Sequence, residues 1–205
     1  MPDGLIQPQV IMKKIYVLAI LAAAGATEVQ AQQGQAPQGG NQTNMGSEDN
    51  AAIQLSLTPD IALYPRTTTI DGFSLNIWGE NEQHGVAFGL VNGSVGQSGG
   101  FSWGLVNYDD AYTGVQWGLV NVSNEKFVGW QRAVVNVDHG TFTGYQDGLV
   151  NVSEDVRGFQ LGLVNYAQQL RGLQIGLVNV AMNNPVFDDF PDKLAPVFPI
   201  VNWSF

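Results

Sequence analysis

Acidic side chains are the residues of this 205-residue chain best suited to holding an ion. They recur between the copies of a repeated motif, at Asp109, Asp110, Glu125, Asp138, Glu154 and Asp155. Clustered carboxylates are ligands that Ca²⁺ prefers, but turns at alternate ends of a sheet would divide this group in two. We therefore interpret these acids, and the later Asp188, Asp189 and Asp192, as a solvated rim and predict no metal site.

No arrangement of residues predicts catalysis. The histidines His84 and His139 lack the spacing of metal ligands, and we interpret them as solvent-exposed. No serine lies in a Gly-x-Ser-x-Gly elbow with a suitable order of histidine and aspartate. The recurring glycines precede no predicted helix that could bind a phosphate. We therefore predict that the chain is not an enzyme and uses no cofactor.

Tryptophans offer a different chemistry, because aromatic rings near a surface can bind glycans by stacking on sugar rings. Those at strand positions are Trp78, Trp103, Trp117 and Trp130. We favour packing in a core or against lipid for these rings and keep glycan binding as the alternative.

Charge and composition limit the classes of partner and site that the chain can have. The formal net charge is -10, and no basic stripe is present to neutralise phosphates, so a nucleic-acid partner is not expected. The chain has no cysteine, which excludes a disulfide framework and thiolate metal sites. An exported protein without cysteine suits a bacterial envelope.

The first segment has the pattern of a secretory signal. Lys13 and Lys14 precede an apolar run at 15–26, and Val29-Gln30-Ala31 provides a small-residue cleavage site. We predict an upstream extension and signal peptide at 1–31 and a disordered leader rich in Gln, Gly and Asn at 32–50. A repeat β domain is predicted at 51–205.

That domain must position every candidate residue, and it repeats one phrase. Gly-Leu-Val-Asn stands at 89–92, 104–107, 118–121, 148–151, 162–165 and 176–179, with a degenerate copy at 133–136. Around it, apolar and small or polar residues alternate with period two, which indicates β-strands. In one unit Gly158, Gln160 and Gly162 form a small face. Phe159, Leu161 and Leu163 form a large apolar face.

The links between repeats favour an antiparallel meander. Linkers such as 123–126 and 153–155 reach at most about 14 Å, enough to close a hairpin but not to return to the start of a long parallel strand. An opening strand at 53–57, eight repeats and a closing strand at 197–205 make ten strands. Outer-membrane barrels have even strand numbers, and a strand of eleven residues, as predicted at 112–122, fits the height of their apolar band. The glycine and glutamine face would point toward the lumen.

A parallel β-solenoid that turns at the glycines is the alternative. It explains why Gln116, Gln131 and Gln146 recur in register, and it would stack Arg132 on Asp147. Against a membrane barrel, a charge on its lipid face costs about 2–4 kcal/mol for Arg at the midplane. The loops are also short, and Pro199 interrupts the closing strand.

The closing residues Val201, Trp203 and Phe205 resemble the C-terminal signal of outer-membrane barrel proteins. The units at 158–165 and 172–179, with 72–79 and 198–203, resemble a group of exported, largely uncharacterised bacterial surface-repeat proteins with Gly-x-Gln-x-Gly-Leu-Val-Asn repeats of 14–15 residues. This resemblance covers about 53–205. It implies a repeat β fold and an envelope or surface location, and it brings no activity or ligand.

We therefore predict a non-enzymatic cell-envelope protein in the outer membrane or at the surface of a Gram-negative-type bacterium. Its role would be structural or surface-related, and outer-membrane lipid would be its partner. The alternative is a soluble, periplasmic or secreted β-repeat module that binds glycan or another polymer.

Overall fold

The computed structural model describes residues 50–205, so the predicted signal peptide and the leader up to residue 49 lie outside the described part. Strands account for most of it. They are β1 (Asn50–Thr58), β2 (Ile61–Ala62), β3 (Thr69–Asn81), β4 (His84–Trp117), β5 (Val120–Arg132), β6 (Val135–Asp147), β7 (Val150–Leu161), β8 (Val164–Ala181) and β9 (Val197–Ser204).

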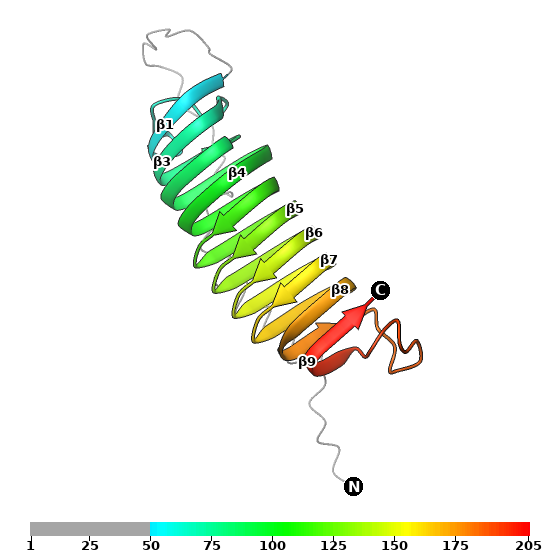
Figure 1. Cartoon of the computed structure of the whole chain (residues 1–205). Coiled ribbons are helices and arrows are strands. Elements are labelled where there is room, and N and C mark those ends of the chain that lie inside the picture. The colour runs from blue at the N-terminus through cyan, green and yellow to red at the C-terminus, as the bar shows by residue number, and fades with distance from the viewer. Residues whose placement is uncertain (1–49) are drawn as a thin grey trace. The chain divides into compact units, whose positions relative to one another are not determined.

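These strands form a parallel β-solenoid (Figure 1). Their order is β2-β1-β3-β4-β5-β6-β7-β8-β9, and every pairing from β1–β3 to β7–β8 is parallel. The all-β prediction is confirmed. The predicted antiparallel meander closing into a barrel is wrong, and the alternative, a parallel solenoid, is correct.

The position of the bends explains the error. The chain bends at Gly118-Leu119, Ala133-Val134, Gly148-Leu149 and Gly162-Leu163, inside the repeated phrase. The supposed linkers at 123–126 and 138–141 lie within β5 and β6. Each strand therefore curves round the solenoid, and the chain reaches the start of the next parallel coil without a hairpin. The estimate of reach failed because it assumed that a strand continues through Gly-Leu.

The bend also changes which side chains face inward. Gln160 and Asn165 are both fully buried, although uninterrupted alternation would put them on opposite faces. Two bend residues, Gly162 and Leu163, separate the strands and shift the alternation. The glutamine face is therefore inside, as predicted, and the asparagine of the motif joins it there.

Glycine at two repeat positions is required by close approach between coils. Gly144 has φ of 134°, and a Cβ there would lie 2.0 Å from the carbonyl oxygen of Gly129. A Cβ on Gly148, which opens a Gly-Leu-Val-Asn copy, would lie 2.7 Å from Nδ2 of Asn136. The glycines therefore recur because stacked coils leave no room for a side chain.

An asparagine ladder runs through the core. In each step Nδ2 of one asparagine donates to Oδ1 of the next at 2.8–3.0 Å. Its members are Asn76, Asn92, Asn107, Asn121, Asn136, Asn151, Asn165 and Asn179. Most also donate to the main-chain carbonyl just before the next bend, as Asn151 does to Leu161 at 2.9 Å. The asparagine therefore fixes both the register and the bend.

A glutamine ladder lies beside an apolar stack in the same interior. Gln174 donates to Gln160 at 2.8 Å and Gln160 to Gln146 at 2.7 Å, so this ladder donates toward the N-terminus. The asparagine ladder donates toward the C-terminus. The rings of Tyr112, Phe127 and Phe142 stack with centroids 5.8 Å apart, and Val156 and Leu170 continue the stack.

Both ends of the solenoid are covered by antiparallel strands. β2 pairs with β1, and β9 pairs with β8. The predicted opening and closing strands are thus present in β1 and β9. Pro199 lies where the β8–β9 register shifts, next to Ile200 with φ of 70°, so its missing N–H interrupts no regular ladder.

Replacing Asn136 with alanine tests the ladder. The change leaves Oδ1 of Asn151 and one amide proton of Asn121 without their partners in a buried site, whereas the carbonyl of Asp147 keeps the backbone N–H of Ala133. At about 1–3 kcal/mol for each of the two unsatisfied groups, we expect a loss of about 2–6 kcal/mol in the free energy of unfolding, measured with urea. The control Asn124→Ala, at an exposed residue of the preceding coil, should change it by less than about 0.5 kcal/mol.

Candidate functional site

One outer side of the solenoid carries columns of apolar side chains, which we call the apolar face. The first column is Phe73, Val86, Phe101, Val115, Trp130, Tyr145, Phe159 and Leu173. The second column is Leu75, Phe88, Trp103, Trp117, Arg132, Asp147, Leu161 and Ile175. The leucine column is Leu90, Leu105, Leu119, Val134, Leu149, Leu163 and Leu177, one from each bend. The columns form because each coil repeats the same alternation.

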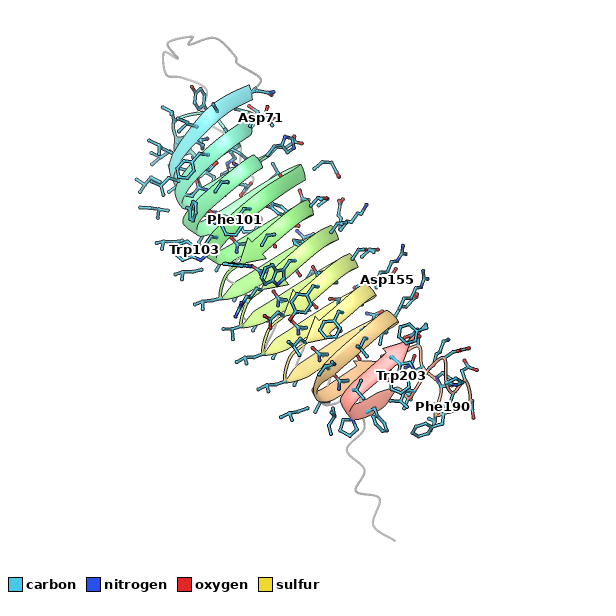
Figure 2. All side chains as sticks on the ribbon, viewed as in Figure 1. Asp71, Phe101, Trp103, Asp155, Phe190 and Trp203 are labelled. Atoms are coloured by element: carbon cyan, nitrogen blue, oxygen red, sulfur yellow. The ribbon has the colours of Figure 1, made fainter. Side chains whose placement is uncertain are left out.

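Aromatic rings of the first two columns touch in sequence along the solenoid. Ring centroids are 6.0 Å apart for Phe88 and Phe101, 5.6 Å for Phe101 and Trp117, and 5.2 Å for Trp117 and Trp130. Trp103 joins through Phe88 at 5.8 Å. Figure 2 labels Phe101 and Trp103 on this side of the ribbon. The rings hold one another in place and form a preorganised surface.

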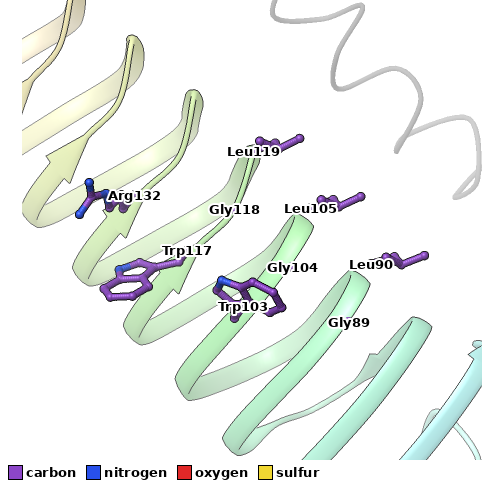
Figure 3. A pocket seen from close by; sticks show the side chains of 9 residues that line it. All are labelled: Gly89, Leu90, Trp103, Gly104, Leu105, Trp117, Gly118, Leu119 and Arg132. Atoms are coloured by element: carbon purple, nitrogen blue, oxygen red, sulfur yellow. The ribbon is translucent and has the colours of Figure 1, made fainter.

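A groove separates the second column from the leucine column. Its floor is Gly89, Gly104 and Gly118, and its walls are tryptophans on one side and leucines on the other (Figure 3). The groove has a volume of about 350 Å³ and is bounded at one end by Arg132. The glycines that coil stacking requires therefore also leave a groove on the outer surface, because they carry no side chain.

The face is exposed to an unusual degree for large apolar side chains. Relative exposure is 52% for Trp103, 50% for Leu105 and 53% for Leu119. Contiguous apolar patches of more than a few hundred Å² on a monomer mark interaction sites. The apolar face is therefore the candidate functional site.

A charged pair interrupts the second column. Arg132 and Asp147 are register partners on adjacent coils, and Nε of the arginine lies 3.5 Å from Oδ2 of the aspartate. The stacking predicted for the solenoid alternative is confirmed. Arg132 is largely exposed and Asp147 is half-buried, so the pair remains available to a partner.

The tryptophans highlighted in the sequence divide between two places. Trp103, Trp117 and Trp130 come together on the apolar face, whereas Trp78 pairs in register with Val91 outside it. Sequence reasoning placed the leucines of the motif on the large apolar face of each unit but missed Phe88 and Phe101 as members of that surface. Aligning the repeats by their motif asparagine would have placed them in columns.

Two of the predicted rim acids are buried, which corrects their interpretation as solvated. Asp109 and Asp138 lie two residues after a motif asparagine, a position that faces inward and holds Ser123 and Ser153 in the neighbouring coils. Asp110 and Glu125 lie nearer the surface, and Asp188, Asp189 and Asp192 are exposed as predicted. The inward position was readable from the repeat alignment.

The buried carboxyls are bonded only to neutral groups in the core. Asp109 accepts from Ser123 Oγ at 2.6 Å and from Gln116 Nε2 at 2.8 Å. Asp138 accepts from Ser153 Oγ at 3.0 Å and from Gln146 Nε2 at 2.5 Å. Burial away from water raises the pKa of each carboxyl to about 7, and these hydrogen bonds offset only part of the rise.

Histidine and metal chemistry add no second site. Both His84 and His139 are exposed, as predicted. The ring of His84 lies 2.8 Å from the carbonyl of Gln97 and 3.0 Å from Asp71, and both contacts raise its pKa. Within residues 50–205, no three His, Cys, Asp or Glu side chains gather as a metal site.

Comparison of the chain with models of protein families, with curated proteins and with solved structures found no match.

Among the described residues, no helix has the length and apolar character needed to cross a membrane.

The pH dependence of stability tests the buried carboxyls. With a pKa near 3.8 when unfolded and about 7 when folded, the native state binds more protons between those values. The stabilisation that these carboxyls give is therefore complete below about pH 4 and is lost as the pH rises through 7. Each carboxyl contributes about 1.4 kcal/mol to the free energy of unfolding for every tenfold difference in proton affinity between the folded and unfolded states. Urea unfolding at pH 4 to 8 should show this fall.

The double variant Asp109→Asn/Asp138→Asn should flatten that profile and exceed the wild type in stability at pH 8. Asp188→Asn, at an exposed position, is the matched control and should leave the profile unchanged. Wild-type stability that rises from pH 4 to pH 8 would contradict buried, uncharged carboxyls.

Proposed function

We propose that this chain is a non-enzymatic structural protein of the bacterial cell envelope, surface-associated, with the apolar face as its interaction surface. The observation that carries the proposal is the continuity of that face over successive coils, from Leu75 to Ile175. Such a surface has no role inside the solenoid, since its side chains point away from the core.

The arrangement of polar groups supports a structural role. The buried asparagines and glutamines bond chiefly to one another and to main-chain carbonyls. Asp109 and Asp138, the two carboxyls whose pKa is raised by burial, are enclosed in the core and face no groove. The repeated internal order therefore yields a stiff scaffold and leaves recognition to the outer face.

Export and envelope location follow from the sequence pattern at 12–31 and from the repeat resemblance. With a solenoid in place of a barrel, the proposed association is peripheral, through an outer side of the coils. Contact with outer-membrane lipid belongs to this proposal as one partner that an apolar face could take.

Cell fractionation tests the location. The full chain, expressed with its own leader in a Gram-negative host, should be found in the envelope fraction or on the surface, where protease added to intact cells can reach it. Processing after Ala31 should give a mature protein that begins at Gln32, as read by N-terminal sequencing. Recovery only in the soluble cytoplasm or soluble periplasm would contradict the proposal.

A second candidate function, glycan binding, is favoured by one observation. The groove presents Trp103 and Trp117 beside each other on adjacent coils, with glycines between them and the leucines (Figure 3). An aromatic wall along the groove suits the stacking of sugar rings.

Glycan-array binding by the full chain tests this candidate. A bound glycan should be lost at least tenfold in affinity on Trp103→Ala, because about 1.4 kcal/mol corresponds to a factor of ten. Trp78→Ala, which lies outside the apolar face, is the matched control and should bind normally. Absence of binding to any glycan, or equal effects of the two variants, would exclude the groove as a glycan site.

A further inference from the structure

We infer that the apolar face is occupied by the same face of a second copy of this chain, in an antiparallel pair with Arg132 of each copy opposite Asp147 of the other. The inference rests on the proposed use of this face as the interaction surface, and it names the partner.

The charged pair selects the geometry. The two-fold axis of this pair runs parallel to the strands and passes between the coils of Arg132 and Asp147. It makes the two solenoids run in opposite directions, and each column of one copy faces the same column of the other. Arg132 then faces Asp147 of the second copy, and the two pairs form a neutral group of alternating charges. An axis along the solenoid would instead place arginine on arginine and aspartate on aspartate, which like-charge repulsion disfavours.

Side-chain size along the second column fits the same arrangement. On the N-terminal side of the charged pair the column is aromatic, with Phe88, Trp103 and Trp117, and on the other side it is aliphatic. Antiparallel pairing about that axis puts Trp117 opposite Leu161 and Trp103 opposite Ile175. Large rings therefore meet smaller side chains, as close packing requires.

Away from the axis, the first column shows the same reciprocal sizes. The axis places Val115 opposite Phe159, and Phe101 opposite Leu173. Trp130 and Tyr145, on the coils next to the axis, face each other at its centre. The size pattern thus repeats in a column that was not used to choose the axis.

The area of the face is sufficient. Coils stack about 4.8 Å apart, and the axis leaves eight layers facing one another, from Phe88 to Val201 of β9. These layers extend about 38 Å, and the three columns span about 13–17 Å along the strands. The shared face therefore measures roughly 500–650 Å² per copy, or about 1,000–1,300 Å² for a pair, which meets the about 1,000 Å² that a specific interface needs.

Lipid fits this face less well than a second copy does. A bilayer would bury Arg132 and Asp147 with no partner beyond each other, in the middle of the second column. A second copy supplies each charge with another opposite charge and leaves no new charge unpaired.

Sedimentation equilibrium of the purified full chain tests the pairing. The wild type should be a dimer at micromolar concentration. Arg132→Asp gathers four acidic side chains at the axis and should weaken association at least tenfold. Adding Asp147→Arg to that variant restores the alternation and should restore the dimer. Lys126→Asp makes the same change in charge at an exposed corner and should leave the dimer intact.

Engineered cysteines test the orientation, because the chain has none of its own. Trp117→Cys/Leu161→Cys should form intermolecular disulfides on mild oxidation. The two positions lie three coils apart in one copy, about 14 Å, too far for an intramolecular bond. Trp117→Cys alone should not cross-link, because its equivalent in the second copy is equally far away.

Each contrary result would overturn the inference. These are a wild type that stays monomeric, a dimer that survives Arg132→Asp in a folded variant as judged by circular dichroism, and cross-linking by Trp117→Cys alone. Cosedimentation of a monomeric wild type with phosphatidylethanolamine–phosphatidylglycerol vesicles would assign the face to lipid instead. These measurements are independent of cell fractionation: a dimer in soluble periplasm would exclude the envelope role alone, and an envelope-bound monomer would exclude the dimer alone.

Discussion

The hydrogen bond from one buried side-chain amide to the next is the interaction on which this structure depends. An amide without a partner in a dry core is costly, and each of these asparagine amides finds another amide to bond only in the adjacent coils. Register between coils is therefore fixed from inside, because a slip by one residue would leave the amide opposite a side chain that cannot bond it. The second amide proton of Asn151, bonded to the carbonyl of Leu161, connects the same side chain to the bend.

Fixing the register from inside has a direct effect outside. Because equivalent residues must stack, each outward position of the repeat forms a column of side chains. The chemical character of that position is then repeated along the solenoid. A leucine at every described bend except that of Val134 gives the leucine column. Aromatic rings one residue after the positive-φ glycines at 100, 129, 144 and 158 contribute to the aromatic surface. The core leaves these side chains free to vary, which is why Arg132 and Asp147 can stand among apolar residues without disturbing the stacked coils.

Local patterns in the sequence were enough to predict strands, their repeat length, the inward glutamines and the terminal strands. Topology could not be predicted from one repeat, because the bend at Gly118-Leu119 is held by contacts with neighbouring coils. Alternation through that bend also gave the wrong face for the motif asparagine. Asp109 and Asp110 are adjacent acids with the same local surroundings in sequence, yet only Asp109 is fully buried. Their difference is visible only when repeats are aligned and the shift at the bend is known.

The opposed directions of the two ladders have a consequence for growth of the fold. An α-helix adds peptide dipoles in one direction, so charge accumulates at its ends. Here the asparagine amides point their donors toward one end and the glutamine amides toward the other, so much of the axial dipole cancels within each coil. Duplication of a coil lengthens the rod without building up an electric field along it, and the number of repeats is free to follow the length that the partner surface requires.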